Sequence, residues 1–180
     1  DQYIAAHGGL QLIEFQPSGV VHVDPVICPL ETVRKLDARL MLFFTGRLRA
    51  AREVLARQRV GTPMKREALR NLCGIARRMR DVLQEGRDLD EFGQLLHTAW
   101  EYKKSVESTI SDSEIDHYYR RGLAAGAVGG KLLGAGGGGF LLFYCDPERQ
   151  ADLRAELSDL VEVPFQFEPQ GSKVIFVSRK

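Results

Sequence analysis

The residues of this sequence with the clearest chemical meaning form a glycine run near the C-terminal end. Positions 134–139 hold five glycines and one alanine, and the apolar segment 140–145 follows directly. A glycine costs roughly 0.5–1 kcal/mol relative to alanine where alanine would fit, so a long run favours a loop that another backbone or a ligand approaches closely. A plain tight turn, which needs one or two glycines, is the alternative.

Two familiar phosphate-binding fingerprints do not fit this run. Positions 134–139 satisfy G-x-G-x-x-G, but a dinucleotide-binding loop needs a strand before it and a helix after it. Here we expect the reverse order, with a helix before the run and a strand after it. No Gly-Lys-Ser/Thr follows the run, so a Walker A loop is excluded as well.

Basic side chains supply the candidate anion-binding groups. Lys103 falls on one helical stripe with the apolar residues Phe92, Leu95, Leu96, Ala99 and Val106. Either its alkyl stem passes the edge of the core and the ammonium reaches water, or the ammonium is held at a cleft to meet a phosphate monoester of charge about −1.5 to −2. Lys104 and Arg47 are further candidates, and Gly46 lies beside Arg47 at an expected strand end, where loops often carry ligand contacts.

Other reactive side chains show no arrangement typical of a site. The four histidines share no metal-ligand spacing, and the three cysteines, Cys28, Cys73 and Cys145, are far apart. No serine lies in a G-x-S-x-G setting, so a hydrolase triad has no support. The sequence therefore assigns no metal ligands, and we interpret the cysteines as free thiols of a protein in the reducing cytoplasm.

Composition indicates a globular protein and is silent about small ligands. The 180 residues carry a net charge of +1, which gives no electrostatic reason to expect nucleic acid or a membrane surface as partner. No apolar run approaches the length of about 20 residues that crosses a bilayer. The first residues lack both a secretory pattern and an initiator Met, so we expect that an earlier part of the protein precedes Asp1.

Hydrophobic patterning predicts a mixture of helices and strands. We expect a hairpin from residues 11–15 and 20–23, a buried strand at 38–44, and another strand at 140–145. Predicted helices cover residues 47–58, 63–84, 88–107, 111–127 and 147–160, and closing strands cover 161–167 and 173–178. Because strands and helices do not alternate regularly, the fold class is α+β, an antiparallel sheet packed with helices.

Charge is segregated along the predicted helices. Residues 47–87 are strongly basic, whereas residues 88–116 are mostly acidic. The helix faces either complement each other within the fold, or they form a positive wall beside a phosphorylated substrate.

With these residues in view, the sequence resembles the C-terminal part of GHMP kinases. Lys131-Leu132-Leu133 and the glycine run are similar to that family's glycine motif, a loop packed against the nucleotide-phosphate loop of the other domain. The resemblance implies that the nucleotide site includes Gly134, Ala135, Gly136, Gly137 and Gly138. The segment that begins with Asp1-Gln2-Tyr3 resembles the one that holds the family's catalytic aspartate. Asp1 would accept the proton of the attacking sugar hydroxyl.

The resemblance extends over essentially the whole chain and points to the branch of heptose 7-phosphate kinases. Its supporting segments are residues 43–46, 100–105, 111–116 and 164–167. It implies transfer of the γ-phosphoryl group of ATP, with Mg²⁺, to the anomeric hydroxyl of a heptose 7-phosphate. Residues 1–37 would be the end of the N-terminal kinase domain with its connecting hairpin, and residues 38–180 the C-terminal, ferredoxin-like domain with extra helices.

One departure limits what this chain does alone. The family's P-x-x-x-G-L-G-S-S-type phosphate loop is absent from the 180 residues, so we predict that the isolated chain is inactive and needs the N-terminal kinase domain. Homodimer formation is a further possibility. The alternatives are a GHMP kinase for another sugar, such as fucose or galactose, and a non-catalytic ferredoxin-like binding module.

Overall fold

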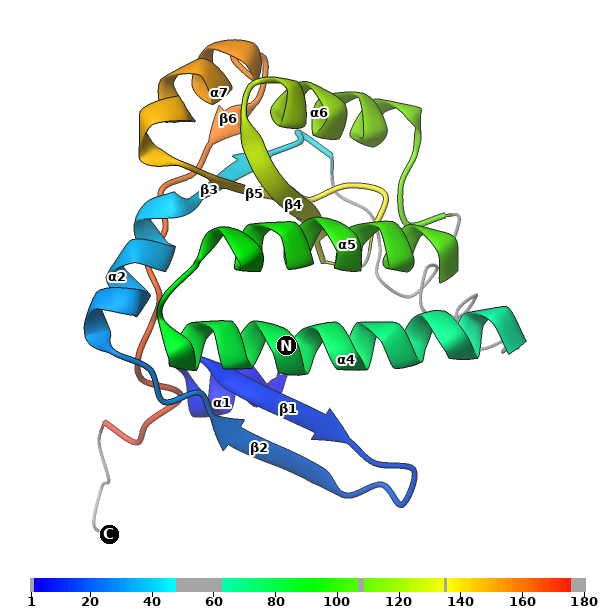
Figure 1. The fold of residues 1–180 in the computed structure, drawn as a ribbon, viewed down its shortest axis with the longest axis vertical. Coiled ribbons are helices and arrows are strands. Elements are labelled where there is room, and N and C mark those ends of the chain that lie inside the picture. The colour runs from blue at the N-terminus through cyan, green and yellow to red at the C-terminus, as the bar shows by residue number, and fades with distance from the viewer. Residues whose placement is uncertain (1, 48–62, 107–108, 135, 176–180) are drawn as a thin grey trace, which may run out of the picture.

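The structure is a computed structural model that describes residues 2–47, 63–106, 109–134 and 136–175. Its main element is a four-stranded antiparallel sheet in the order β4-β5-β3-β6 (Figure 1). The strands are β3 (Leu40–Phe44), β4 (Ala127–Leu133), β5 (Phe140–Cys145) and β6 (Val161–Glu162). The predicted α+β class is confirmed.

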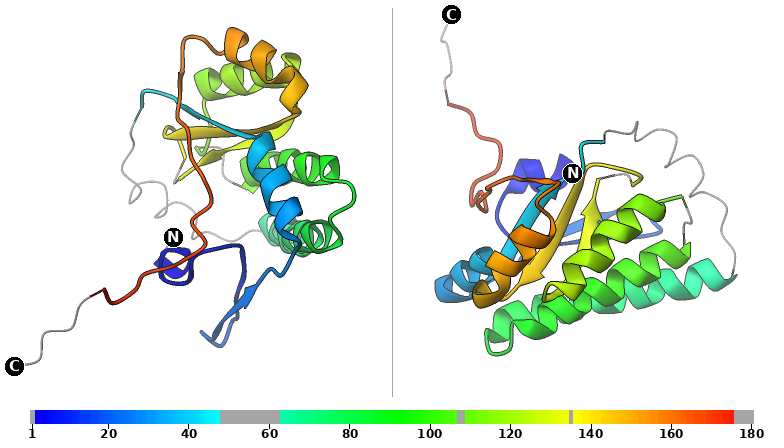
Figure 2. Two further views of the ribbon diagram at one scale, coloured as in Figure 1. Left: turned by 90° about the vertical axis from the view of Figure 1, so that its left-hand side faces the viewer. Right: turned by 90° about the horizontal axis from the view of Figure 1, so that it is seen from above.

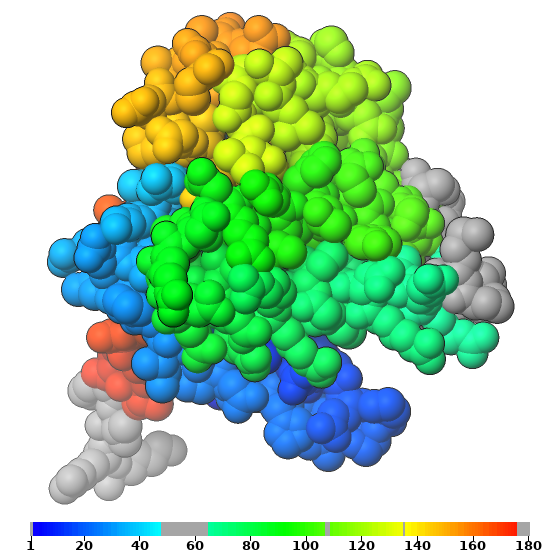
Figure 3. Space-filling model, in the orientation of Figure 1, coloured from blue at the N-terminus to red at the C-terminus, as the bar shows by residue number. Residues whose placement is uncertain are grey.

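Helices cover both faces of this sheet. Figure 2 shows α2 (Leu30–Arg39), α4 (Pro63–Glu85) and α5 (Asp90–Val106) on one face. The other face carries α6 (Ser113–Ala124) and α7 (Gln150–Glu156), which follows the short 3-10 turn η1 (Pro147–Arg149). In the space-filling view, α4 and α5 lie against each other along much of their length (Figure 3).

Alternating side chains of the central strands build one hydrophobic cluster on each face. Phe43 and Phe143 belong to the cluster under α6 and α7, where their rings meet edge to face at 6.1 Å. Tyr144, the next residue of β5, packs with Leu36 and Leu96 under α2 and α5. This period of two is the strand geometry expected for a buried apolar run. In β3, the buried Met41 and Phe43 alternate with half-buried neighbours, and the predicted strand is confirmed from Leu40 to Phe44.

Local signals define the helix ends. The Asp112 carboxylate accepts hydrogen bonds from the backbone N–H groups of Glu114 and Ile115, which caps α6. Gly86 has φ +65° directly after α4, a conformation that suits glycine at a helix C-terminus. Helices α4, α5 and α6 were predicted close to their observed bounds.

The N-terminal elements form a separate small layer against α4. The predicted hairpin is confirmed as β1 (Gln11–Phe15) paired with β2 (Val21–Pro25), and α1 (Gln2–His7) precedes it. Arg77 of α4 donates to Glu14 of β1 at 2.6 Å. The C-terminal segment returns to this layer, where the N–H of Gly9 donates to the Glu168 carbonyl.

Three sequence expectations were wrong in detail. Residues 38 and 39 end α2, a helix that the sequence patterns missed, so β3 begins at Leu40. The helix expected to reach residue 127 ends at Ala124, and residues 127–133 form β4. Of the closing strands, only Val161–Glu162 pairs within the described part of residues 161–178. The helix predicted at residues 47–58 lies almost wholly outside the described residues.

Glycines within β4 explain why this strand escaped prediction. Glycine is unfavourable in strands, so Gly129 and Gly130 suggested a loop. In the structure, a Cβ at Gly129 would overlap the carbonyl oxygen of Gly93, and α5 therefore lies directly on the strand backbone. The glycines serve close helix–strand packing rather than a turn.

This packing yields a stability prediction for the full-length protein. Gly129→Ala is expected to lower the free energy of unfolding by about 1–3 kcal/mol, because the added methyl group has no space beside α5. Gly74→Ala is the matched control on α4. Nothing lies within 4 Å of the position that a Cβ at Gly74 would take, so this change should raise stability by about 0.5–1 kcal/mol. Urea unfolding of both variants measures the difference, and equal effects would contradict the packing argument.

Candidate active site

The glycine run connects β4 and β5 and is pinned to two segments far away in sequence. The N–H of Gly137 donates to the Ile110 carbonyl at 2.9 Å, and the N–H of Gly139 donates to the Arg47 carbonyl at 2.8 Å. A strand rather than a helix precedes the run, which corrects the order expected from the sequence. The dinucleotide-binding fingerprint stays excluded, because a strand also follows it.

Steric contact explains several of these glycines. A Cβ at Gly136 would lie 2.6 Å from a side-chain atom of Ile110 and 2.9 Å from its Cα, and Gly136 has φ +104°. A Cβ at Gly138 would lie 2.9 Å from the Arg47 carbonyl oxygen. Gly136, Gly137 and Gly138 are buried, whereas Gly134 is exposed with nothing within 4 Å of its Cβ position. The sequence predicted that another backbone or a ligand approaches this loop closely. Part of that close contact comes from Ile110 and Arg47 of the same chain.

Thr45 fastens the C-terminal end of the glycine run, a role that the sequence patterns did not reveal. Its N–H and its hydroxyl both donate to the Gly139 carbonyl at 2.9 Å, and its hydroxyl oxygen lies 3.1 Å from the Gly139 N–H, which can donate to it. Thr45 is 7% exposed although it is polar. The one sequence signal was its place at the end of a buried strand before Gly46.

Arg47 forms ion pairs with two carboxylates at the start of α6. Its guanidinium lies 2.8 Å from Asp112 and 2.9 Å from Glu114, and the hydrogen bond with Asp112 followed by that residue's charge raises the pKa of Arg47. Gly46 is exposed with φ +71° and open space around it. Both residues lie beside the glycine run, but the charge of Arg47 already has partners.

Lys103 and Lys104 lie in different environments. Lys104 pairs with Glu101 at 2.8 Å and with Asp116 at 3.6 Å, and its ammonium lies 5.9 Å from the centre of the Trp100 ring. Lys103 is half-buried and lines a pocket of about 230 Å³ between α4, α5 and β4. Of the two adjacent lysines, Lys103 lines this pocket and Lys104 does not.

Lys131 of β4 lines the same pocket and was not among the predicted site residues. Burial lowers the pKa of Lys103, and burial followed by the positive charge of Lys103 lowers the pKa of Lys131. The remaining lining residues are apolar or aromatic: Leu72, Ile75, Ala76, Met79, Leu96, Ala99 and Trp100. The sequence signal was the place of Lys131 directly before the glycine motif.

Two predicted site residues, Asp1 and Ala135, lie outside the described residues. Gln2 opens α1, whose Ala5 carbonyl accepts a hydrogen bond from the N–H of Ser172. Both views of Figure 2 show α1 on the side of the molecule to which the loop between β4 and β5 points. The fold therefore places α1 and the connection between β4 and β5 on one side of the molecule.

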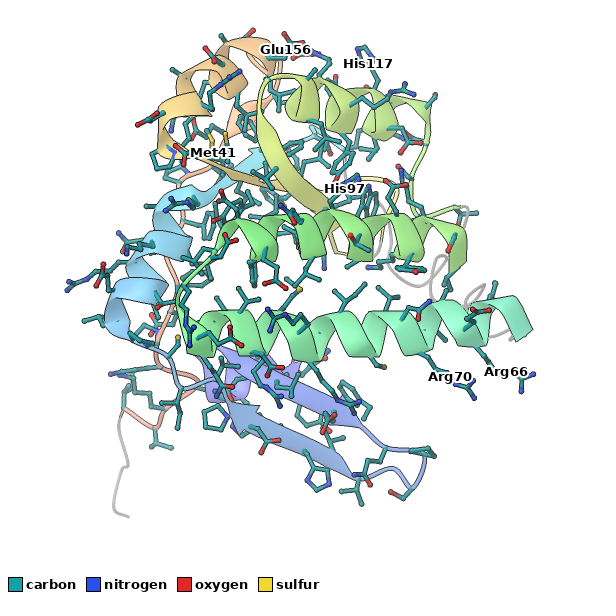
Figure 4. The ribbon with its side chains drawn as sticks, in the orientation of Figure 1. Met41, Arg66, Arg70, His97, His117 and Glu156 are labelled. Carbon is teal, nitrogen blue, oxygen red and sulfur yellow. The ribbon has the colours of Figure 1, made fainter. Side chains whose placement is uncertain are left out.

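The basic residues of α4 do not form a wall around this pocket. Arg78 pairs with Glu91 of α5 at 2.6 Å, and Arg77 pairs with Glu14. Arg66 and Arg70 extend from α4 away from α5 (Figure 4). Exposed pairs of this kind contribute little to stability. The interpretation of complementary helix faces fits these contacts.

The described residues offer neither a membrane span nor a metal cluster. No helix within the described ranges is long and apolar enough to cross a membrane. The same residues contain no group of three or more His, Cys, Asp or Glu side chains that could hold a metal ion.

Comparison with known proteins connects this fold and its glycine loop with small-molecule kinases. Residues 66–162 match the family described as GHMP kinases C terminal. The chain belongs to the GHMP kinase family, and it corresponds to the C-terminal part of these kinases.

Three relatives illustrate the relation. The chain is 31% identical over 155 residues to D-glycero-alpha-D-manno-heptose 7-phosphate kinase of Campylobacter jejuni, covering 85% of this chain and 45% of that protein. It is 29% identical to the bifunctional fucokinase/GDP-fucose pyrophosphorylase of Arabidopsis thaliana, covering 79% of this chain and 14% of that protein. A solved structure of a putative sugar kinase from Campylobacter jejuni superimposes with a TM-score of 0.70 at 28% identity, covering 94% of this chain and 48% of that one. The chain thus spans less than half of each relative.

The glycine contacts predict a graded effect of alanine substitutions in the full-length protein. Gly134→Ala should cost about 1–2 kcal/mol of unfolding free energy, because only the left-handed backbone at φ +90° opposes it. Gly136→Ala should cost about 1–3 kcal/mol more, because its methyl group also overlaps Ile110. Urea denaturation checks this order, and a Gly134 variant as unstable as the Gly136 variant would argue against the contact with Ile110.

Proposed function

We propose that this chain is the C-terminal part of an ATP-dependent sugar kinase that phosphorylates the anomeric hydroxyl of a heptose 7-phosphate. The observation that carries the proposal is the buried glycine loop, pinned to Ile110 and Arg47, in a chain that is 31% identical to a heptose 7-phosphate kinase. In the proposal, the backbone of Gly134, Ala135, Gly136, Gly137 and Gly138 forms the wall against which the nucleotide phosphates and their loop lie.

The chemistry needs positioning and charge neutralisation more than covalent catalysis. Asp1 acts as the base that orients the sugar hydroxyl and accepts its proton. Lys103, Lys104, Arg47 and Gly46 are the proposed substrate-binding residues. Of the three basic side chains, Lys103 has the strongest structural support, because Lys104 and Arg47 are paired with carboxylates.

The remainder of the active site belongs to the other part of the protein. Residues 1–37 are proposed as the end of the N-terminal kinase domain with its hairpin, and residues 38–180 as the C-terminal domain. The phosphate loop and the residues around Mg²⁺ come from the N-terminal domain, consistent with coverage of 45% of the Campylobacter kinase. Mg²⁺ would enter with ATP and neutralise phosphate charge. The isolated chain is therefore expected to be inactive, and homodimer formation stays a prediction.

A second candidate is a kinase of the same family acting on fucose or galactose. The 29% identity to a plant fucokinase favours it. The two candidates differ in whether the substrate carries a phosphate before the reaction. A panel of free sugars and sugar phosphates, assayed with the full-length protein and Mg-ATP, separates them. Turnover of heptose 7-phosphate with loss of the reducing end supports the first candidate, and turnover of free fucose or galactose alone rejects it.

The role of Asp1 leads to a kinetic prediction. Asp1→Asn in the full-length protein should lower kcat by about 10²–10⁴-fold, because the amide cannot accept the proton. The thermal midpoint of unfolding should change little. Asp24→Asn is the matched control, since Asp24 is an exposed carboxylate on β2. Steady-state phosphorylation assays measure both variants, and a kcat for Asp1→Asn within threefold of the control would remove Asp1 from the mechanism.

A further inference from the structure

The pocket between α4, α5 and β4 holds two lysines without partners. Within the described residues, neither Lys103 nor Lys131 has a hydrogen bond or an ion pair, whereas Lys104, one residue away from Lys103, has two carboxylates. Like charges in a half-buried space disfavour each other, and a fold ordinarily pairs them with anions. A bound anion would reduce the repulsion between the two ammonium groups.

Trp100, another residue of the lining, carries a third donor without a partner. Trp100 is 1% exposed, and within the described structure its indole nitrogen Nε1 has no hydrogen-bond partner. Buried N–H groups are nearly always paired in folded proteins, so an unpaired one calls for a ligand or an ordered water. The pocket offers donors from α5 and β4 and no carboxylate among its described lining residues.

The walls specify the kind of anion. Apolar side chains from α4, such as Ile75 and Met79, exclude water from one side of the pocket. Attraction between opposite charges is stronger in such a low-dielectric setting. Two ammonium groups match a phosphate monoester of charge about −2 better than a carboxylate of charge −1. The shared chemistry is that of a phosphate group, whether on a sugar or on a nucleotide.

We propose that Lys103 and Lys131 together form the subsite for the phosphate group that the sugar substrate already carries, with Lys131 as a substrate-binding residue in addition to those named above. The inference rests on the proposed function, since that function supplies a phosphorylated sugar. The sugar phosphate is preferred over the nucleotide because the pocket is walled by α4 and α5 and lacks glycine-run residues in its described lining.

Kinetics of the full-length protein test the subsite. Lys131→Met should raise KM for heptose 7-phosphate by about 10- to 100-fold, the loss expected for a charge-assisted hydrogen bond. The KM for ATP should stay within about twofold, and the preference for heptose 7-phosphate over unphosphorylated heptose should fall by the same factor as KM rises. Lys35→Met, which removes an exposed lysine of α2 that is paired with Glu31, is the control. The inference is overturned if only the KM for ATP changes, or if the KM for heptose 7-phosphate rises no more than it does in the control variant.

A binding measurement tests the phosphate subsite independently of the proposed sugar-kinase function. Inorganic phosphate serves as the probe, and the readout is the thermal midpoint of the full-length protein. Phosphate should raise the midpoint of the wild type and of Lys35→Met but not of Lys131→Met. If this pattern holds while heptose 7-phosphate is not turned over, the subsite stands and the proposed function fails. If phosphate shifts all three proteins equally, the subsite is rejected.

Stability without ligand supplies a further prediction. The lowered pKa means that protonated Lys131 costs folding free energy, so Lys131→Met should be more stable than the wild type at pH 7. As pH rises toward the ordinary lysine value of 10.5, the folded wild type loses its proton before the unfolded chain does, and its stability rises. The advantage of the variant should therefore shrink.

Urea unfolding between pH 7 and pH 10 measures this trend. Among the residues that line the pocket from α4, α5 and β4, Lys103 is the titratable neighbour of Lys131. A Lys131→Met variant less stable than the wild type at pH 7 would mean that the lysine is satisfied within the fold, and this would overturn the inference.

Discussion

The hydrogen bonds between Thr45 and Gly139 are the constraint on which the candidate site depends. They continue the pairing of β3 with β5 beyond Phe44 and Phe140 and close the far end of the glycine loop. The loop is then drawn onto the Ile110 carbonyl through Gly137. Backbone donors and acceptors fix its shape, so the wall that it presents is set before any ligand arrives.

Charge is distributed unevenly around this wall. Arg47 and Lys104 find carboxylates at the start of α6 and on α5, and these pairs belong to the fold itself. Lys103 and Lys131 find none in the described structure. Proteins tolerate unsatisfied charge mainly where function requires it, since its cost must be offset elsewhere. The contrast separates cations whose charge the fold already pairs from cations whose charge is unpaired within the described structure.

Much of the fold follows from local patterns, and its errors have a common cause. The hairpin, helices α4 to α6 and the strand after the glycine run agree with turn residues, caps and apolar periodicity. Helix α2 was missed because it is short and begins without a side-chain cap at Pro29. Strand β4 was missed because Gly129 and Gly130 have no strand preference of their own, and the reason for them lies on α5. Propensity describes a residue, whereas packing involves a partner that a short stretch of sequence does not contain.

The sequence by itself determined the α+β class, the glycine loop and its resemblance to GHMP kinases, because these depend on residue types and short spacings. Only the tertiary structure decided which cations have partners. Neighbouring helix positions differ by about 100° in direction, so Lys103 faces the pocket while Lys104 faces carboxylates. Lys131 reaches the same pocket from β4, twenty-eight residues further along the chain. Whether a cation on one helix or strand has a partner on another depends on how the two elements pack. The spacing of residues within a single element does not reveal this.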